Sequence, residues 1–317
     1  MSAIQQKGNI FQGIRIPTVT EVLAVSTYSV SATAAVNGNY AAIADNGNDR
    51  VYVFDGTTWT SANPSITNLS AIALKSDGSA IVLCDSTAAG TAFRRSTDGG
   101  ANWANVTNPT SGNALTKILC GGSTFIAIKD GNSSTEIARS TDSGATFAAV
   151  TVTSGTYTSI ATDGAGTWLV CTGTTAAIRS SDDGANWSSV TLPASPGQKS
   201  VWYSGGKFRL MTSTGVCYYS TDGTTGSWSA AIPVGTYPAA FPTGSNLSIA
   251  SNGKYIYALD NGYLRKINTE AADAVCVNTG GGLVSATNLL YIAGNIYTMS
   301  TTSTVHSLSL VKISNVP

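Results

Sequence analysis

The sequence predicts an all-β fold built from repeated units of four short strands. Three observations lead to this prediction. Only 11% of the residues are charged and Glu occurs only at positions 21, 136 and 270, a composition that disfavours long surface helices. Apolar runs of strand length alternate with turns rich in Gly and Asp. One turn-like phrase also returns at a nearly constant spacing, which is the sequence signature of a repeat architecture.

The repeated phrase has the form Ser-x-Asp-x-Gly-x-x-Trp/Phe. It is RSTDGGANW at 95–103, RSTDSGATF at 139–147, RSSDDGANW at 179–187 and YSTDGTTGSW at 219–228. Its serines are 44, 40 and 40 residues apart, and a degenerate copy, VFDGTTW at 53–59, precedes them. Periods of this size in a sequence of strands and turns are typical of β-propeller blades.

The unit at 157–193 contains all four predicted strands. Strands are expected at 157–162, 167–172 and 176–181, after which the repeated phrase turns the chain into a fourth strand from residue 187. The same order fits the neighbouring units, so we predict a single seven-bladed β-propeller of four-stranded antiparallel blades. Its predicted blades are 30–64, 69–109, 114–153, 157–193, 197–233, 246–279 and 282–314, within a domain at 30–317.

The segment at 1–29 is predicted to be an N-terminal arm and closing strand. Residues from about 9 to 20 are extended in character and would add a strand to the last blade. Closing the ring in this way removes the exposed sheet edges that a linear array would carry.

The repeated phrase resembles the Asp-box, or bacterial neuraminidase repeat, of β-propellers. Propellers with this repeat include sialidases, xyloglucanases, sorting receptors and assembly factors, so the resemblance implies a fold rather than one function. In such a turn Asp can accept hydrogen bonds from its own backbone, Gly supplies positive φ and the aromatic ring packs over the blade. We therefore expect structural rather than catalytic roles for Asp98, Asp142, Asp182, Asp222, Trp103, Phe147, Trp187 and Trp228.

A ligand site is predicted on the face opposite these turns, because the loops there vary in length from blade to blade. Aromatic, Asp and Asn side chains on such a surface suit a sugar or a protein ligand. The candidates are Asp45, Asn46, Tyr157, Tyr237, Phe241, Asp260, Asn261 and Tyr263. For Tyr237 and Phe241 the alternative is that they only cover the next blade.

The remaining composition excludes several classes of partner. Lys and Arg total 17, as do Asp and Glu, so the net charge gives no reason to bind nucleic acid or an anionic membrane. The five cysteines lie in or beside apolar runs and are expected to be free, buried thiols. With His306 as the single histidine, we predict no metal and no cofactor. No apolar run has the length of a signal peptide or a membrane span, so membrane insertion and secretion are not expected.

We predict a binding or structural module that is not an enzyme. Low charge and abundant Thr, Ser, Gly and Ala resemble bacteriophage virion proteins, which are made in the host cytoplasm. A tail-fibre or spike head is the first expectation and a baseplate or capsid-decoration protein the second. The expected partners are other virion proteins, a host surface glycan or receptor, or further copies of this chain.

The alternative is a sialidase-like glycoside hydrolase. The tripeptide RIP at 15–17 resembles the Arg-Ile-Pro motif of sialidase propellers, in which Arg15 would hold the substrate carboxylate. Glu136 is the only Glu expected on a ligand-side loop. The rest of the chain departs from the sialidase pattern of further arginines and a Tyr–Glu pair.

Overall fold

The computed structural model describes most of the chain, and every element in the described part is a β-strand. The described residues are 18–24, 32–45, 49–66, 68–85, 93–110, 114–129, 133–196, 201–212, 216–233, 248–253, 255–260, 263–270, 273–278, 285–292, 295–301 and 308–314. Their strands form six sheets, and all the pairings are antiparallel. The prediction of an all-β fold made of four-stranded antiparallel units is confirmed.

Four of the sheets contain four strands that are consecutive in sequence. The first two are β2 (Ala32–Asn37), β3 (Tyr40–Asp45), β4 (Arg50–Phe54) and β5 (Trp59–Ala62), then β6 (Leu69–Leu74), β7 (Ile81–Asp85), β8 (Phe93–Ser96) and β9 (Ala104–Val106). The other two are β17 (Val201–Ser204), β18 (Lys207–Met211), β19 (Val216–Ser220) and β20 (Ile232–Pro233), then β21 (Ser248–Asn252), β22 (Tyr255–Asp260), β23 (Tyr263–Asn268) and β24 (Asp273–Asn278).

A seven-stranded sheet stands in the middle of the chain because one long strand serves two units. Its strands are β10 (Lys117–Gly121), β11 (Thr124–Ile128), β12 (Ser133–Ser140), β13 (Ala148–Thr162), β14 (Trp168–Thr172), β15 (Ala176–Ser180) and β16 (Ser188–Thr191). The first part of β13 pairs with β12 and the second part with β14. Residues 154–157, which the sequence suggested were a loop between blades, therefore lie inside a strand, where Gly155 pairs with Ser134.

The N-terminal strand joins the last sheet. Strand β1 (Thr18–Ala24) pairs with β27 (Leu308–Ser314), which continues through β26 (Asn295–Thr301) to β25 (Ser285–Ile292). The pairing of a segment before residue 30 with the last strands agrees with the prediction. The described pairing covers 18–24 and overlaps the predicted 9–20 at 18–20, and residues 9–17 lie outside the described part.

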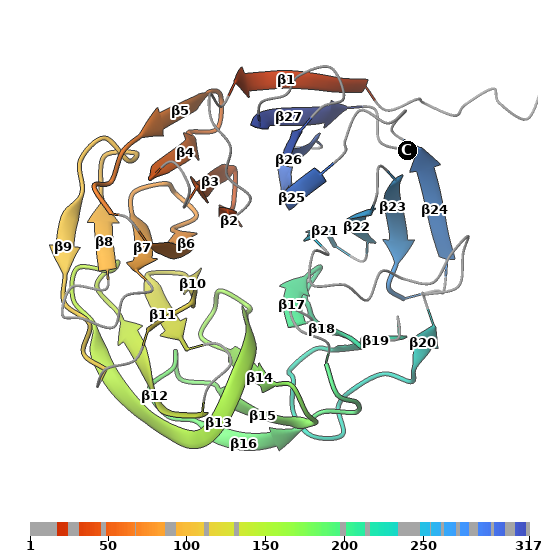
Figure 1. Ribbon diagram of the computed structural model, residues 1–317. Coiled ribbons are helices and arrows are strands. Elements are labelled where there is room, and N and C mark those ends of the chain that lie inside the picture. Colours follow the sequence, from red (N-terminus) through yellow and green to blue (C-terminus); the bar gives the residue numbers. More distant parts are fainter. Residues whose placement is uncertain are drawn as a thin grey trace, which may run out of the picture.

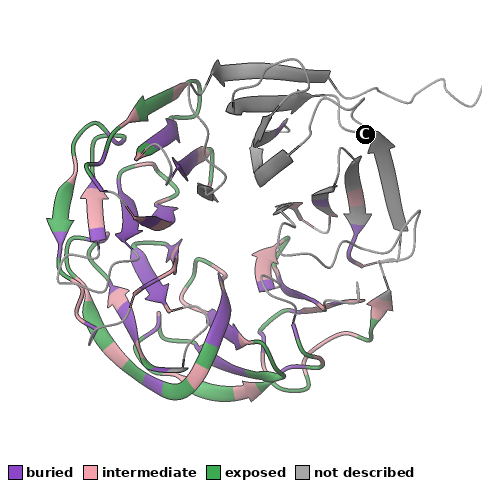
Figure 2. Ribbon diagram, viewed as in Figure 1, coloured by how far each residue is buried: buried purple, intermediate pink, exposed green. Residues whose placement is uncertain are grey.

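The sheets stand around a common central axis, with the first strand of each unit nearest the axis and the last strand outermost (Figure 1). Strand β2 contacts β25 on one side and β6 on the other, and β13 contacts β17. Figure 2 shows that the outer strands β5, β9 and β16 are mostly exposed, whereas buried residues lie further in. This is the arrangement of a β-propeller.

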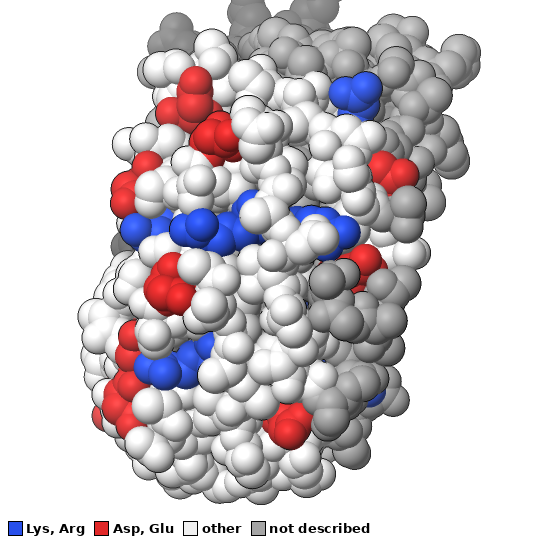
Figure 3. All heavy atoms as spheres, turned by 90° about the vertical axis from the view of Figure 1, so that its left-hand side faces the viewer, with Lys and Arg blue, Asp and Glu red and all other residues white. Residues whose placement is uncertain are grey.

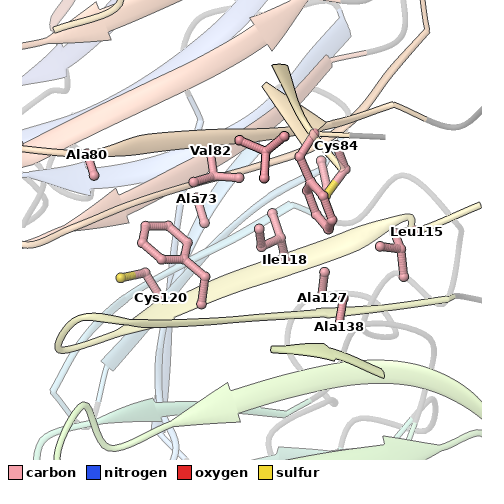
Figure 4. Packing of buried hydrophobic residues seen from close by; sticks show 13 residues of the cluster. Ala73, Ala80, Val82, Cys84, Leu115, Ile118, Cys120, Ala127 and Ala138 are labelled. Atoms are coloured by element: carbon pink, nitrogen blue, oxygen red, sulfur yellow. The ribbon is translucent and has the colours of Figure 1, made fainter. Parts of the chain in front are cut away.

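The core lies between neighbouring sheets. One cluster combines Val82 and Cys84 of β7 with Ile118 and Cys120 of β10, among other buried side chains (Figure 4). Burial raises the pKa of the Cys120 thiol to about 12. The prediction of free, buried thiols is confirmed for Cys84, Cys120, Cys171 and Cys217, the cysteines whose side chains the structure describes.

Candidate functional site

The repeated turn at 95–103 is held by a hydrogen-bond network of its own. The Ser96 hydroxyl donates to Asp98 Oδ1 at 2.8 Å and accepts from the Gly100 N–H at 2.9 Å. The Asn102 N–H donates to the same carboxylate oxygen at 2.9 Å. The indole N–H of Trp103 donates to the Gly100 carbonyl at 2.8 Å, so the ring is fixed over the turn.

The three later copies repeat this carboxylate geometry. A Ser hydroxyl and a backbone N–H also donate to Asp142, Asp182 and Asp222; the N–H belongs to the fourth residue after Asp142 and Asp182, but to the second residue after Asp222. Hydrogen bonds, led by the backbone N–H of the turn, lower the pKa of Asp98, Asp182 and Asp222 to about 2. Partial burial raises the pKa of Asp142, but bonds from Thr146 and Ser140 outweigh it and the value is again about 2. These carboxylates are therefore ionised and accept hydrogen bonds within their own turns.

An arginine just before each of three turns connects neighbouring units. Arg95 Nε donates to the Ser143 carbonyl at 2.7 Å. Arg139 Nε donates to the Asp183 carbonyl at 2.7 Å, and Arg179 Nε to the Asp222 carbonyl at 2.6 Å. In each case the acceptor belongs to the repeated turn of the following unit. We call this contact the arginine latch; its signal in the sequence is the Arg that opens three of the four copies.

The turn glycine rests on the preceding unit beside the latch. Gly144 has φ +79°, and a Cβ there would lie 2.4 Å from Val82 Cγ2. Gly184 has φ +81°, and a Cβ there would lie 2.4 Å from Ile126 Cδ1. Both glycines are thus required by backbone conformation and by close approach to the preceding unit. The repeated turn joins units as well as reversing the chain.

The arginine of the latch is missing at the interface between the β2–β5 and β6–β9 sheets. Arg95 pairs with Val82 and Ala104 across its sheet, and the residue that pairs in the same way in the preceding sheet is Val53, with Ala42 and Thr60. An apolar side chain with no donor therefore occupies the arginine position.

A cleft of about 300 Å³ lies at this point. Its apolar lining includes Tyr40, Val53, Leu74 and Ile81, and its polar lining includes Thr60, Asp55 and Asp98 beside Gly78 and Gly99. The Asp55 carboxylate accepts from the N–H groups of Thr57 and Thr58, both at 2.8 Å. These bonds, led by the one from Thr58, lower the pKa of Asp55 well below its usual range. The cleft thus combines an apolar wall with two ionised carboxylates.

Two binding residues that the sequence suggested, Tyr157 and Asp45, have described side chains and do not line the cleft. Tyr157, expected on a binding surface, is 1% exposed in the core, where Gly155 leaves room for its ring. Its hydroxyl donates to the Thr153 carbonyl. Asp45, also expected to bind, is fully buried at the end of β3. These two expectations are corrected: both residues face the packed interior.

The other candidates cannot be compared with the cleft. Asn46, Tyr237, Phe241, Asn261 and Arg15 lie outside the described residues. The backbones of Asp260 and Tyr263 pair with each other at the β22–β23 hairpin. Glu136, expected on a loop, lies within β12 instead.

A buried arginine that the sequence did not single out connects two further sheets. Arg209 of β18 is 1% exposed. It donates to Glu270 Oε1 at 2.8 Å and to Thr269 Oγ1 at 2.7 Å, just beyond β23. Lys207 Nζ lies 3.2 Å from the same carboxylate oxygen. Hydrogen bonding from Arg209 holds the pKa of Glu270 below its usual range.

Charge is dispersed on the face shown in Figure 3, where short bands of basic and acidic side chains alternate. Within the described ranges, no three His, Cys, Asp or Glu residues gather in a way that would hold a metal ion. That part of the chain also contains no helix long and apolar enough to cross a membrane.

Comparison with known proteins supports the architecture. The family model of the DUF6242 β-propeller domain matches residues 104–257. No similar sequence was found among curated proteins. Among solved structures, YCF48 bound to D1 peptide is similar at 11% identity and a TM-score of 0.64, covering 95% of this chain and 98% of that one. YCF48 from Cyanidioschyzon merolae is similar at 13% identity and a TM-score of 0.64, covering 93% and 98%.

A third similar structure corrects the expectation that the chain is not an enzyme. Virginiamycin B lyase from Staphylococcus aureus, with quinupristin, is similar at 11% identity and a TM-score of 0.68, covering 94% of this chain and 99% of that one. Because an enzyme shares the fold, the fold gives no argument against catalysis. At these identities the likeness shows architecture alone. The family model and the solved structures together place this chain among the β-propellers.

Proposed function

We propose that this β-propeller binds a partner protein through the cleft between its β2–β5 and β6–β9 sheets. The observation that carries the proposal is the cleft itself, where an apolar wall meets two ionised carboxylates. Such a combination is typical of sites that bury a side chain and orient its polar end. The similar propeller YCF48, which has been solved with D1 peptide, gives a precedent for peptide binding on this fold.

We further propose that the scaffold is a closed ring of seven blades. Support comes from the strand order, if β13 is counted once for each unit that it serves and β1 completes the last unit. A ring of this kind presents clefts between blades on a rigid frame, which limits the entropy lost on binding.

The placement of this module in a bacteriophage virion is also a proposal. It rests on the composition, with few charges and abundant Thr, Ser, Gly and Ala. In that setting the partner would be another virion protein, and the chain would be made in the host cytoplasm.

Recognition of a host surface glycan is a second candidate. It is favoured by the β22–β23 hairpin, where the register sets Asp260 opposite Tyr263. A carboxylate and an aromatic residue at one hairpin end are suited to stacking on a sugar ring and bonding its hydroxyls.

Selection from a random peptide library on the immobilised protein tests the first proposal. Selected peptides should bind the wild type and should bind Thr60→Trp at least tenfold more weakly, because the indole fills the cleft. Ser61→Trp is the matched control, since the next residue of β5 points to the other side of the strand. Equal binding by all three proteins would contradict a role for the cleft. Glycan-array binding without any selected peptide would favour the second candidate.

A further inference from the structure

We propose that the cleft between the β2–β5 and β6–β9 sheets is a receptor for the arginine side chain of a partner protein. This inference deepens the proposed function and rests on it, because it names the chemistry that the partner brings. The chain's own repeats show which side chain fills the equivalent position at the other interfaces.

The arginine latch supplies the template. At three interfaces between units, a guanidinium Nε donates to a main-chain carbonyl of the next repeated turn at 2.6–2.7 Å. The arginine stem lies beside the turn glycine, with Arg95 Cδ 3.7 Å and Arg139 Cδ 3.5 Å from the Cβ positions of Gly144 and Gly184. A guanidinium and its stem are therefore the native occupants of these interfaces.

The cleft lies where this occupant is missing from the sequence. By strand register, Val53 occupies the position of the latch arginine. Its side chain is shorter than that of arginine and has no guanidinium group. Ser143 and Asp183 each follow the Asp of their turn, and the residue that follows Asp98 is Gly99. Both Val53 and Gly99 line the cleft. At this interface the donor residue of the latch is absent, because Val53 replaces the arginine. The repeated turn at 95–103, which corresponds to the turns that supply the acceptor carbonyl elsewhere, is present.

The cleft lining fits an arginine brought by another protein. Leu74 and Ile81 are apolar lining residues suited to the methylene stem, and the lining also contains an aromatic residue, Tyr40, of the kind that attracts cations. Asp55 and Asp98 add two carboxylates to the carbonyl of the turn. A planar guanidinium with five donors can satisfy several acceptors at once, whereas an ammonium ion acts as a point charge. The lining therefore favours arginine over lysine.

Titration calorimetry with three blocked tripeptides tests the inference. Acetyl-Gly-Arg-Gly-amide should bind the full chain with a Kd on the order of 1 mM, as expected for a single buried side chain. The lysine peptide should bind at least tenfold more weakly, and the citrulline peptide, which has the same shape without charge, should show no binding.

A substitution that restores the latch gives the decisive comparison. Val53→Arg should fill the cleft from within the chain, raise the melting temperature and abolish binding of the arginine peptide. Ser61→Arg adds the same charge outside the cleft and should leave both properties unchanged. If Val53→Arg does not fold, as judged by circular dichroism, Thr60→Trp serves as the blocking variant and should abolish peptide binding.

The outcomes separate this inference from the proposed function. Equal affinity for the arginine and lysine peptides, or undiminished arginine binding in the blocked variants, would overturn the arginine site. Library peptides that lack arginine but lose binding in Thr60→Trp would overturn this inference and leave the protein-binding function standing. Library peptides that bind Thr60→Trp as well as the wild type would overturn both.

Discussion

The carboxylates of the repeated turn show how a single side chain fixes a chain reversal. Asp182 accepts from the Ser180 hydroxyl at 2.7 Å and from the N–H and side-chain amide of Asn186 at 2.9 and 2.7 Å. These donors favour the ionised carboxyl, which is why its pKa is about 2. The network is local, so its sequence spacing is enough to predict it.

Stability should fall in acid because of these residues. The folded pKa of the four turn aspartates, about 2, lies below the ordinary 3.8. Their contribution is therefore fully present above about pH 4 and is lost as the pH falls from 4 to 2. Calorimetric melting temperatures between pH 5 and 2 should decline steeply in this window, and Asp182→Asn should decline less. A wild-type curve that is flat from pH 4 to 2 would show that the turns do not hold ionised carboxylates.

Removal of one turn carboxylate should have a modest cost at neutral pH. Asp182→Ala should lower the free energy of unfolding by about 1 kcal/mol, because the Asn186 N–H that loses its acceptor is exposed to water. Chemical denaturation measures the loss. A loss of unfolding free energy several times larger would mean that Asp182 stabilises the packing of the core as well as its own exposed turn.

The turn glycines should be more sensitive than the aspartates. In Gly184→Ala, positive φ costs about 1–2 kcal/mol and the new methyl group meets Ile126, which adds about 1–3 kcal/mol. Gly164→Ala is the control, because its φ is +73° and nothing lies within 4 Å of its Cβ position. The difference between the two variants in denaturation isolates the contact between units. Equal costs would mean that Ile126 moves aside freely.

Contacts between elements differ around the molecule, although the units repeat. At three of the repeated turns, an arginine of the preceding unit donates a hydrogen bond to a main-chain carbonyl. Arg209 of β18 instead donates to the carboxylate of Glu270. The guanidinium of Arg209 is almost completely buried. Its stability therefore depends strongly on the carboxylate of Glu270.

Glu270→Gln should therefore be costly. Loss of the carboxylate leaves Arg209 buried with an uncompensated charge, and we expect a loss of about 3 kcal/mol in the free energy of unfolding. Lys207→Met removes the more exposed cation from the same carboxylate and should cost at most about 1 kcal/mol. Denaturation of both variants measures the difference. Similar losses would show that the two cations share the interaction equally.

Local patterns explain which elements the sequence predicts correctly. The strands β14, β15 and β16 lie within one or two residues of their predicted bounds because Gly- and Asp-rich turns separate them. The pattern failed at 154–156, which it left between two blades, because Gly155 and Thr156 pair with β12 and the same strand then continues to pair with β14. A small residue inside a strand looks like a turn when the pairing partner is unknown.

Contacts between units explain what the sequence could not predict about the candidate site. The arginine latch reaches a turn in the next unit, 43 to 48 residues away, so no local pattern describes it. The cleft arises because Val53 replaces an arginine, and the equivalence of these residues becomes visible only through strand register. Tyr157 was misplaced for a similar reason, since the space for its ring depends on Gly155.

The continuous strand β13 has a consequence for the folding of the whole molecule. Because its two parts are edges of two different units, neither unit can lose this strand without disturbing the other. The residues from β10 to β16 should therefore open as one cooperative foldon, while the four-stranded sheets open separately. Native-state hydrogen exchange in low denaturant measures this. The amides of β11 and β14 should exchange through the same opening and should therefore have the same free energy of opening. Distinct openings for these two strands would mean that the junction near Gly155 acts as a hinge between independent folding units.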